Sequence, residues 1–227
     1  MTMANILSAE DRRKAASAVV AAESRANGEI VPVFSQASDN YADVALAWSA
    51  AIALVALCAL EIGSDFYLGL VDRSLGMWAH RWTPHEAFGL ALFVAAIKFA
   101  GMWLLMLWRP LRLWLTPGAI KARRVRARAM LAFRLAAQGR THGATGVVIF
   151  LSLAERRAEI VADAAIASRV PPEIWGNAMH AMLTEIRAGR TGDGLVAAIE
   201  QVGQVLAEHF PREAAAVNEL PDGVIEL

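Results

Sequence analysis

Gly146–Leu153 has the sequence GVVIFLSL, in which every residue except Gly146 and Ser152 is apolar. A run of this length and composition is typical of a strand that is buried on both faces of a sheet. A short turn, Ala154–Arg157 (AERR), separates it from Ala158–Ala162 (AEIVA), which has the composition of a second strand. Because the connection is so short, the two strands are predicted to pair antiparallel. This pair forms the centre of a predicted α/β fold.

Helices are predicted on both sides of the strand pair along the chain. Ala119–Gln138 carries apolar residues at helical spacing. Pro171–Ala188 begins with two prolines, which suit the first turn of a helix. Gly189–Gly194 (GRTGDG) is predicted to be a turn, and Leu195–His209 is predicted to be the last helix.

The N-terminal segment adds one more helix and one more strand. Ser8 and Asp11 have the spacing of a capping box, with an acidic residue three positions after the cap. The helix that they begin is expected to run to about Arg25. Glu29–Phe34 (EIVPVF) then has the composition of a short strand. Pro32 lacks a backbone donor, which favours an edge position or a strand end.

Two long apolar runs separate these segments from the rest of the chain. Val44–Ile62 contains one charge, at its end, and Ala87–Trp108 contains one charge near its centre. Runs of about 20 mostly apolar residues are typical of helices that span a bilayer. The alternative is that both form buried core helices of a soluble protein. Helices that are apolar on all sides would need a large surrounding protein, which 227 residues do not supply.

The predicted fold is therefore a small α/β sandwich that is interrupted by a two-helix transmembrane hairpin. The first strand cannot be stable alone, so it must pair with the later strands on the same side of the membrane. Residues 1–41 contain the first helix and strand, and residues 42–115 contain the hairpin, with spans at about 44–62 and 87–108. Residues 116–210 complete the sandwich, and residues 211–227 form a loosely ordered C-terminal tail.

Charge is strongly segregated along the chain. Arg109–Arg134 contains eight basic residues and no acidic residue, whereas the loop Gly63–Glu86 contains only Arg73 and Arg81 as bases. Excess Lys and Arg beside a span marks its cytoplasmic side. Both termini are thus expected in the cytoplasm and the loop on the opposite side. The single cysteine, Cys58, allows no intrachain disulfide and no cysteine metal cluster.

Several segments resemble the TPM-domain family. Gly146–Asp163 resembles its strand motif, and Ile186–Leu195 (IRAGRTGDGL) is similar to its F-R-x-G-x-x-x-x-G-L segment. Leu7–Asp11 and Gly28–Val33 resemble the opening helix and first strand of that domain. The chain looks most similar to the bacterial membrane-protein branch, in which a hydrophobic insert follows the first strand. The resemblance implies an α/β sandwich.

The resemblance also implies candidate activities. The family includes accessory proteins of membrane receptors, and phosphatase activity and calcium binding are ascribed to some members. Where many members carry Asp-Asn-Gly before the buried strand, this chain has Ala144-Thr145-Gly146. Where many carry Gly-Tyr-Gly after the next strand, it has Asp163-Ala164-Ala165.

A candidate cation or phosphate site is centred on Asp163. This residue ends a predicted strand, and α/β sheets often bind ligands beyond the carboxyl ends of their strands. Glu159 and Asp193 are the other candidate metal ligands, with Glu155 nearby in the turn. The alternative is structural: Asp163 caps the following helical turn, and Glu155 and Arg157 are solvated turn charges.

Candidate contacts with the membrane or a partner carry positive charge. Lys98 lies near the middle of the second run, where an ionisable residue is costly and suggests function. It is expected either to pair with a partner membrane subunit or to snorkel. The basic helix carries Arg123, Arg124, Arg126 and Arg128, which are expected to contact anionic lipid or an acidic partner. Nucleic-acid binding is not expected, because no stacking aromatics are interleaved.

Two functions follow from these observations. The first is a membrane-anchored, TPM-like interaction module, not an enzyme, that assists assembly or quality control of a membrane complex. The second is a membrane-anchored phosphatase or metal-dependent hydrolase with a degenerate site. No cofactor is expected in the first case, and a divalent cation such as calcium in the second. The expected partners are the lipid bilayer and either another membrane protein or a second copy of the chain. The expected location is the bacterial inner membrane.

Overall fold

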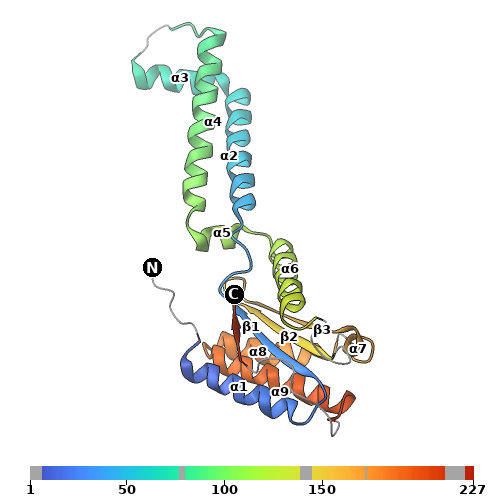
Figure 1. The fold of residues 1–227 in the computed structure, drawn as a ribbon. Coiled ribbons are helices and arrows are strands. Elements are labelled where there is room, and N and C mark those ends of the chain that lie inside the picture. Colours follow the sequence, from blue (N-terminus) through green and yellow to red (C-terminus); the bar gives the residue numbers. More distant parts are fainter. Residues whose placement is uncertain (1–6, 77–79, 139–144, 172, 213–222) are drawn as a thin grey trace. The chain divides into compact units, whose positions relative to one another are not determined.

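The structure is a computed structural model that describes residues 7–76, 80–138, 145–171, 173–212 and 223–227 (Figure 1). The chain divides into two compact units. Met1–Asp39 and Gly118–Leu227 together form one unit, which we call the sheet unit. Asn40–Pro117 forms the other, which we call the hairpin unit. The sheet unit is thus assembled from two segments that lie far apart in the sequence.

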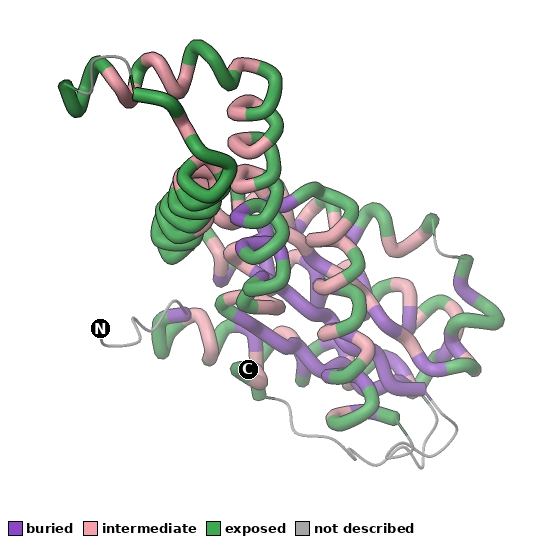
Figure 2. The backbone as a smooth tube through the Cα atoms, turned by 90° about the horizontal axis from the view of Figure 1, so that it is seen from above, coloured by how far each residue is buried: buried purple, intermediate pink, exposed green. Residues whose placement is uncertain are grey.

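A four-stranded sheet in the order β3-β2-β1-β4 is the centre of the sheet unit. β1 (Glu29–Ser35) pairs parallel with β2 (Gly146–Ser152), and β2 pairs antiparallel with β3 (Arg157–Ala162). The predicted strand pair is therefore confirmed. Every residue of β1 and β2 is buried, and the strands form the buried interior of this unit in Figure 2. The fourth strand, β4 (Ile225–Glu226), pairs parallel with β1.

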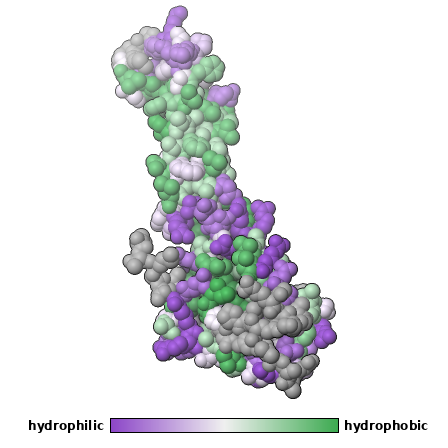
Figure 3. Space-filling view, in the orientation of Figure 1, coloured by the Kyte–Doolittle hydropathy of each residue, from purple (hydrophilic) through white to green (hydrophobic). Residues whose placement is uncertain are grey.

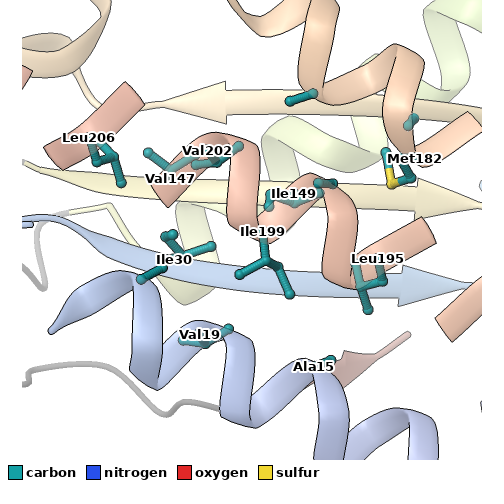
Figure 4. Packing of buried hydrophobic residues seen from close by; sticks show 14 of the residues in the cluster. Ala15, Val19, Ile30, Val147, Ile149, Met182, Leu195, Ile199, Val202 and Leu206 are labelled. Atoms are coloured by element: carbon teal, nitrogen blue, oxygen red, sulfur yellow. The ribbon is translucent and has the colours of Figure 1, made fainter. Parts of the chain in front are cut away.

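Helices cover both faces of this sheet. α1 (Ala9–Glu23), α8 (Trp175–Arg187) and α9 (Thr191–His209) pack on one face, and α6 (Gly118–Ala136) packs on the other. Successive side chains along β2 point to opposite faces of the sheet, as strand geometry requires. Val147 and Ile149 face α9 (Figure 4), whereas Val148 and Phe150 belong to the cluster beneath α6. The mixed α/β fold class is confirmed.

The N-terminal helix begins at the predicted capping box. The Ser8 hydroxyl accepts a hydrogen bond from the Asp11 N–H at 3.0 Å, and the Ser8 N–H donates to the Asp11 carboxylate at 3.1 Å. These two bonds satisfy backbone and side-chain groups at the helix start reciprocally. Buried Ala15, Val19 and Ala22 then form the face of α1 that packs inward.

The last helix starts earlier than the sequence predicts. α9 begins at Thr191, so Gly192 and Gly194 are helical rather than part of a turn. A Cβ atom on Gly194 would lie 2.7 Å from the Met182 carbonyl oxygen of α8. The glycine therefore allows two helices to approach closely, which composition alone does not distinguish from a turn. α8 also differs: it begins at Trp175, after the prolines rather than at them.

Two further predictions need correction, one about Pro32 and one about the C-terminal tail. Pro32 lies in the middle of β1, which is not an edge strand of the sheet, although β4 does not extend to Pro32. The position tolerates proline because β4 pairs only with Val33 and Phe34, beyond Pro32. Part of the predicted loose tail is also ordered, since Ile225–Glu226 forms β4. Residues 213–222 of that tail lie outside the described residues.

The hairpin unit is helical throughout its described residues except in short connections. It contains α2 (Ala42–Ile62), α3 (Ser64–Leu75), α4 (Pro84–Met106) and α5 (Arg109–Leu115). α2 and α4 pack against each other, and both are long and apolar enough to cross a membrane. Only 11% of the most apolar window of α2 is buried, and none of that of α4. The apolar surface of the two helices is visible in Figure 3, so the structure does not bury them as core helices.

Candidate functional site

Polar residues lie at both ends of the sheet face that α6 covers. Alternation along the strands places Val31, Val33, Val148, Phe150 and Val161 in the apolar cluster beneath α6. The same alternation puts Glu29, Gly146 and Asp163 at one end of this face. It puts Ser35 and Ser152 at the other end, where they are paired in register. We call the two sets the amino-end group and the carboxyl-end group, after the ends of β1 and β2.

The amino-end group is built around Gly146. Asp163 donates its backbone N–H to the Gly146 carbonyl at 2.9 Å, and its carboxylate accepts from the Gly146 N–H at 3.3 Å. Glu29 is the register partner of Gly146 on β1. Glu29 and Asp163 are only 9% and 8% exposed. Two buried carboxylates therefore flank one glycine, on neighbouring strands to either side of it.

Asp163 lies at the N-cap position of α7 (Ala164–Ala167), as the structural interpretation predicts. Its side chain makes no cap hydrogen bond to that helix, however. Its carboxylate bonds across to β2 instead. Since β3 runs antiparallel to β2, the carboxyl end of β3 lies beside the amino ends of β1 and β2. The expectation that Asp163 joins the loops at the carboxyl ends of the parallel strands is therefore wrong.

Glu159 and Asp193, the other candidate metal ligands, lie elsewhere. Glu159 is on the α6 face of β3, where it pairs with Arg126 at 3.1 Å. It is four residues from Asp163, roughly 13 Å along a strand. Asp193 is in α9, on the opposite face of the sheet. The pKa of Lys14 in α1 is raised, chiefly by its hydrogen bond to Glu10 and by the charge of Glu10. The charge of Asp193 raises it further, which shows that Asp193 lies near α1.

The structure thus does not bring Asp163, Glu159 and Asp193 together. Within the described ranges, no group of three or more His, Cys, Asp or Glu side chains could hold a metal ion. Calcium takes six to eight oxygen ligands, and the amino-end group offers two carboxylates with the buried Thr145 next to them. These residues do not make up a calcium ligand set.

Glu155 of the β2–β3 turn lies beside the carboxyl-end group and is 7% exposed. Its carboxylate accepts hydrogen bonds from the Ser152 hydroxyl and from the Ser38 N–H, the latter at 3.0 Å. Arg156, next in the turn, has a positive φ of 52°. The interpretation of Glu155 as a solvated turn charge is wrong. Composition did not reveal the burial of Glu155, since its bond to the Ser38 N–H joins segments 117 residues apart in the sequence.

Contacts next to this group hold the chain on both sides of the hairpin unit. On the side that leads to α2, the Ala154 N–H donates to the Gln36 carbonyl at 3.0 Å, and Asp39 pairs with Arg124 of α6. On the side that returns from α5, Arg157 donates to the Gly118 carbonyl at 3.3 Å. The β2–β3 turn and α6 therefore hold the two segments where the chain leaves and rejoins the sheet unit.

Comparison with known proteins finds one family model that matches part of this unit. Residues 119–205 match the family described as the TPM domain. This chain carries a TPM domain. The matched residues extend from α6 into α9, and α1, β1 and β4 complete the same sheet. The sheet unit is called the TPM domain from here on.

A solved structure has a fold similar to that of this chain. It is the NMR structure of the BA42 protein from the psychrophilic bacterium Bizionia argentinensis, with a TM-score of 0.57 and 17% identity. The match covers 100% of this chain and 99% of that one. At this identity the likeness concerns the fold alone. No curated protein matches the chain.

The basic helix α6 of the TPM domain divides its arginines between two roles. Arg124 pairs with Asp39 and Arg126 with Glu159, so both help to hold the domain together. Arg123 is exposed, and Arg128 is partly buried. The exposed face of α6 also includes Leu131 and Leu135, which are 44% and 62% exposed.

Lys98 is exposed on α4 of the hairpin unit. Glu61 lies in the last turn of α2. Across the described parts of the chain, Lys98 makes no ion pair or hydrogen bond, with Glu61 or with any other residue. The charge in the middle of the apolar helix therefore has no counter-charge among the described residues of the hairpin unit.

Proposed function

We propose that this protein is an integral membrane protein whose TPM domain and hairpin form an interaction module for a membrane complex. In this proposal α2 and α4 span the bacterial inner membrane, and both termini lie in the cytoplasm. The module assists assembly or quality control of its partner. The proposal rests chiefly on one observation, the exposed and unpaired Lys98 in α4.

The position of Lys98 gives this observation its weight. α4 has 23 residues, about 35 Å of helix, and Lys98 lies eight residues before its end at Met106, about 12 Å along the axis. Charged residues within a span usually face protein or water and pair with another group. The acidic residues of the two spans, Asp43, Glu61 and Glu86, lie in their first or last turns. A carboxylate that pairs with Lys98 at this depth would therefore belong to a different membrane protein.

Affinity purification of the full-length chain from native membranes in mild detergent tests this proposal. A membrane protein with an acidic residue in a span is expected to copurify with the wild type and with Lys98→Arg. Lys98→Leu is expected to insert equally well and to lose that partner. If the wild type brings down only itself, or if Lys98→Leu keeps the same partner, a snorkelling lysine is the better explanation.

The alternative of a metal-dependent hydrolase is favoured by a single feature, the buried carboxylates of Glu29 and Asp163 beside Gly146. Calorimetric titration of the purified full-length protein with Ca²⁺, Mg²⁺ and Mn²⁺ tests it. The alternative predicts stoichiometric binding of one of these ions and its loss in Asp163→Asn. Absence of binding in the wild type would exclude a resident metal of this kind.

A further inference from the structure

The outer edge of β1 is covered by the C-terminus of the chain. β4 pairs with β1 through Val33↔Ile225 and Phe34↔Glu226. The Leu227 N–H donates to the Phe34 carbonyl at 2.9 Å, and the Ser35 hydroxyl donates to the Leu227 carbonyl oxygen at 3.1 Å. The last residues of the chain thus add a strand to the sheet, in the manner of a bound peptide.

The side chains of this segment alternate between the two faces of the sheet. Val224 packs against the cluster beneath α1 and α9, whereas Ile225 packs against the cluster beneath α6. Glu226 returns to the first face, where it pairs with Arg12 of α1 at 2.9 Å. Backbone pairing provides the affinity of such an arrangement, and the alternating side chains provide its specificity. The β1 edge is therefore shaped to accept this particular sequence.

The contact is nevertheless short. β4 pairs with two of the seven residues of β1, and a strand of this length has little stability of its own. Short peripheral elements open with much lower free energy than the core of a domain. When β4 leaves, Val33 and Phe34 present unpaired backbone groups at an exposed edge, which is a template for another strand.

We propose that the β1 edge is a docking site for the C-terminal strand of a second copy of this chain. The complementary segment, Gly223–Leu227, is present in every copy, and exchange preserves each contact described above, so it costs little. Membrane anchoring would also raise the effective concentration of one copy near another. This self-association involves the TPM domain only, and it is independent of Lys98 and of the proposed partner.

Disulfide trapping between two differently tagged full-length chains tests the proposal. Both chains carry Cys58→Ser, which removes the native cysteine, and both carry their tags at the N-terminus, away from β4. One chain carries Arg12→Cys and the other Glu226→Cys, which replaces an exposed ion pair. After coexpression and mild oxidation in the membrane, a disulfide-linked dimer that contains both tags is expected.

A matched control replaces Arg12→Cys by Val20→Cys. Val20 is 51% exposed on the same helix, but it lies eight residues further along α1, about 12 Å from position 12. This pair is expected to give several-fold less mixed dimer.

A single chain with both Arg12→Cys and Glu226→Cys reports whether β4 occupies the edge at all. An internal disulfide in that chain, with no mixed dimer above the control, would show that β4 stays on its own copy and would overturn the proposal. Absence of both products would overturn it as well.

Discussion

Glu155 is a charged residue that the TPM domain keeps almost entirely away from water. A buried carboxylate is costly unless hydrogen bonds compensate for its lost hydration. Here Ser152 and the Ser38 N–H provide them from two different segments of the domain. One side chain thus joins the β2–β3 turn to the segment that leads to α2. Glu155 stabilises the domain through its hydrogen bonds, because an apolar side chain in its place could not accept the bond from the Ser38 N–H.

Replacing Glu155 by alanine is expected to destabilise the TPM domain by about 2–4 kcal/mol, because two donors lose their acceptor and an unsatisfied buried group costs about 1–3 kcal/mol. Hydrogen exchange of the β2 amides in the detergent-solubilised full-length protein measures the change in opening free energy. Glu173→Ala is the matched control, since Glu173 is exposed. Equal exchange rates in the two variants would show that the Glu155 hydrogen bonds contribute nothing to stability.

The contact between α1 and α9 depends on a glycine. A Cβ atom on Gly203 would lie 2.5 Å from the Cβ of Ala22, which is far inside van der Waals contact. Leu195, Ile199, Val202 and Leu206 of α9 lie over the sheet in Figure 4, so α9 cannot shift away from α1 without losing those contacts. Small side chains on both helices therefore set their separation.

Gly203→Ala is accordingly expected to destabilise the domain by about 1–3 kcal/mol, as overpacking of a core usually does. Adding Ala22→Gly should recover part of this loss, because it removes the atom that clashes. Gly176→Ala in α8 is the matched control, since a Cβ atom there meets nothing within 4 Å. Thermal unfolding of the purified full-length protein measures these three variants and the wild type. A stable Gly203→Ala protein with unchanged unfolding would show that α1 and α9 can separate at low cost.

The elements that composition could predict are those with long and regular patterns. β2, β3, α1, α6 and the two apolar helices follow from runs and periodicity alone. The early start of α9 could not be predicted, because Gly192 and Gly194 resemble a turn until the close approach of α8 is known. β4 could not be predicted either, since two residues carry no period and depend on the edge of β1. For the same reason the amino-end group and the Ser38–Glu155 hydrogen bond could be identified only from the structure.

At the scale of the whole molecule, the domain is completed only after the chain returns from the hairpin unit. β1 precedes α2, and its partner β2 follows α6, so the parallel β1–β2 ladder links segments on either side of the hairpin. In the proposed arrangement, with α2 and α4 spanning the membrane, folding in this order requires both segments on one side of the membrane. The same requirement follows from the basic residues of Arg109–Arg134. The strand pairing and the charge bias are thus two separate physical arguments for the proposed topology.

Reporter fusions test this topology directly. Alkaline phosphatase, which is active only outside the cytoplasm, is expected to be active when fused after Leu75 at the end of α3 and inactive when fused after Leu227. A fluorescent protein that folds only in the cytoplasm is expected to give the reverse pattern at the same two sites, which controls for expression. An active phosphatase at Leu227 would place the C-terminus outside the cytoplasm. Activity at both sites would mean that only one of α2 and α4 spans the bilayer. β1 and β2 would then be separated by the membrane, and their observed pairing could not form in the inserted protein.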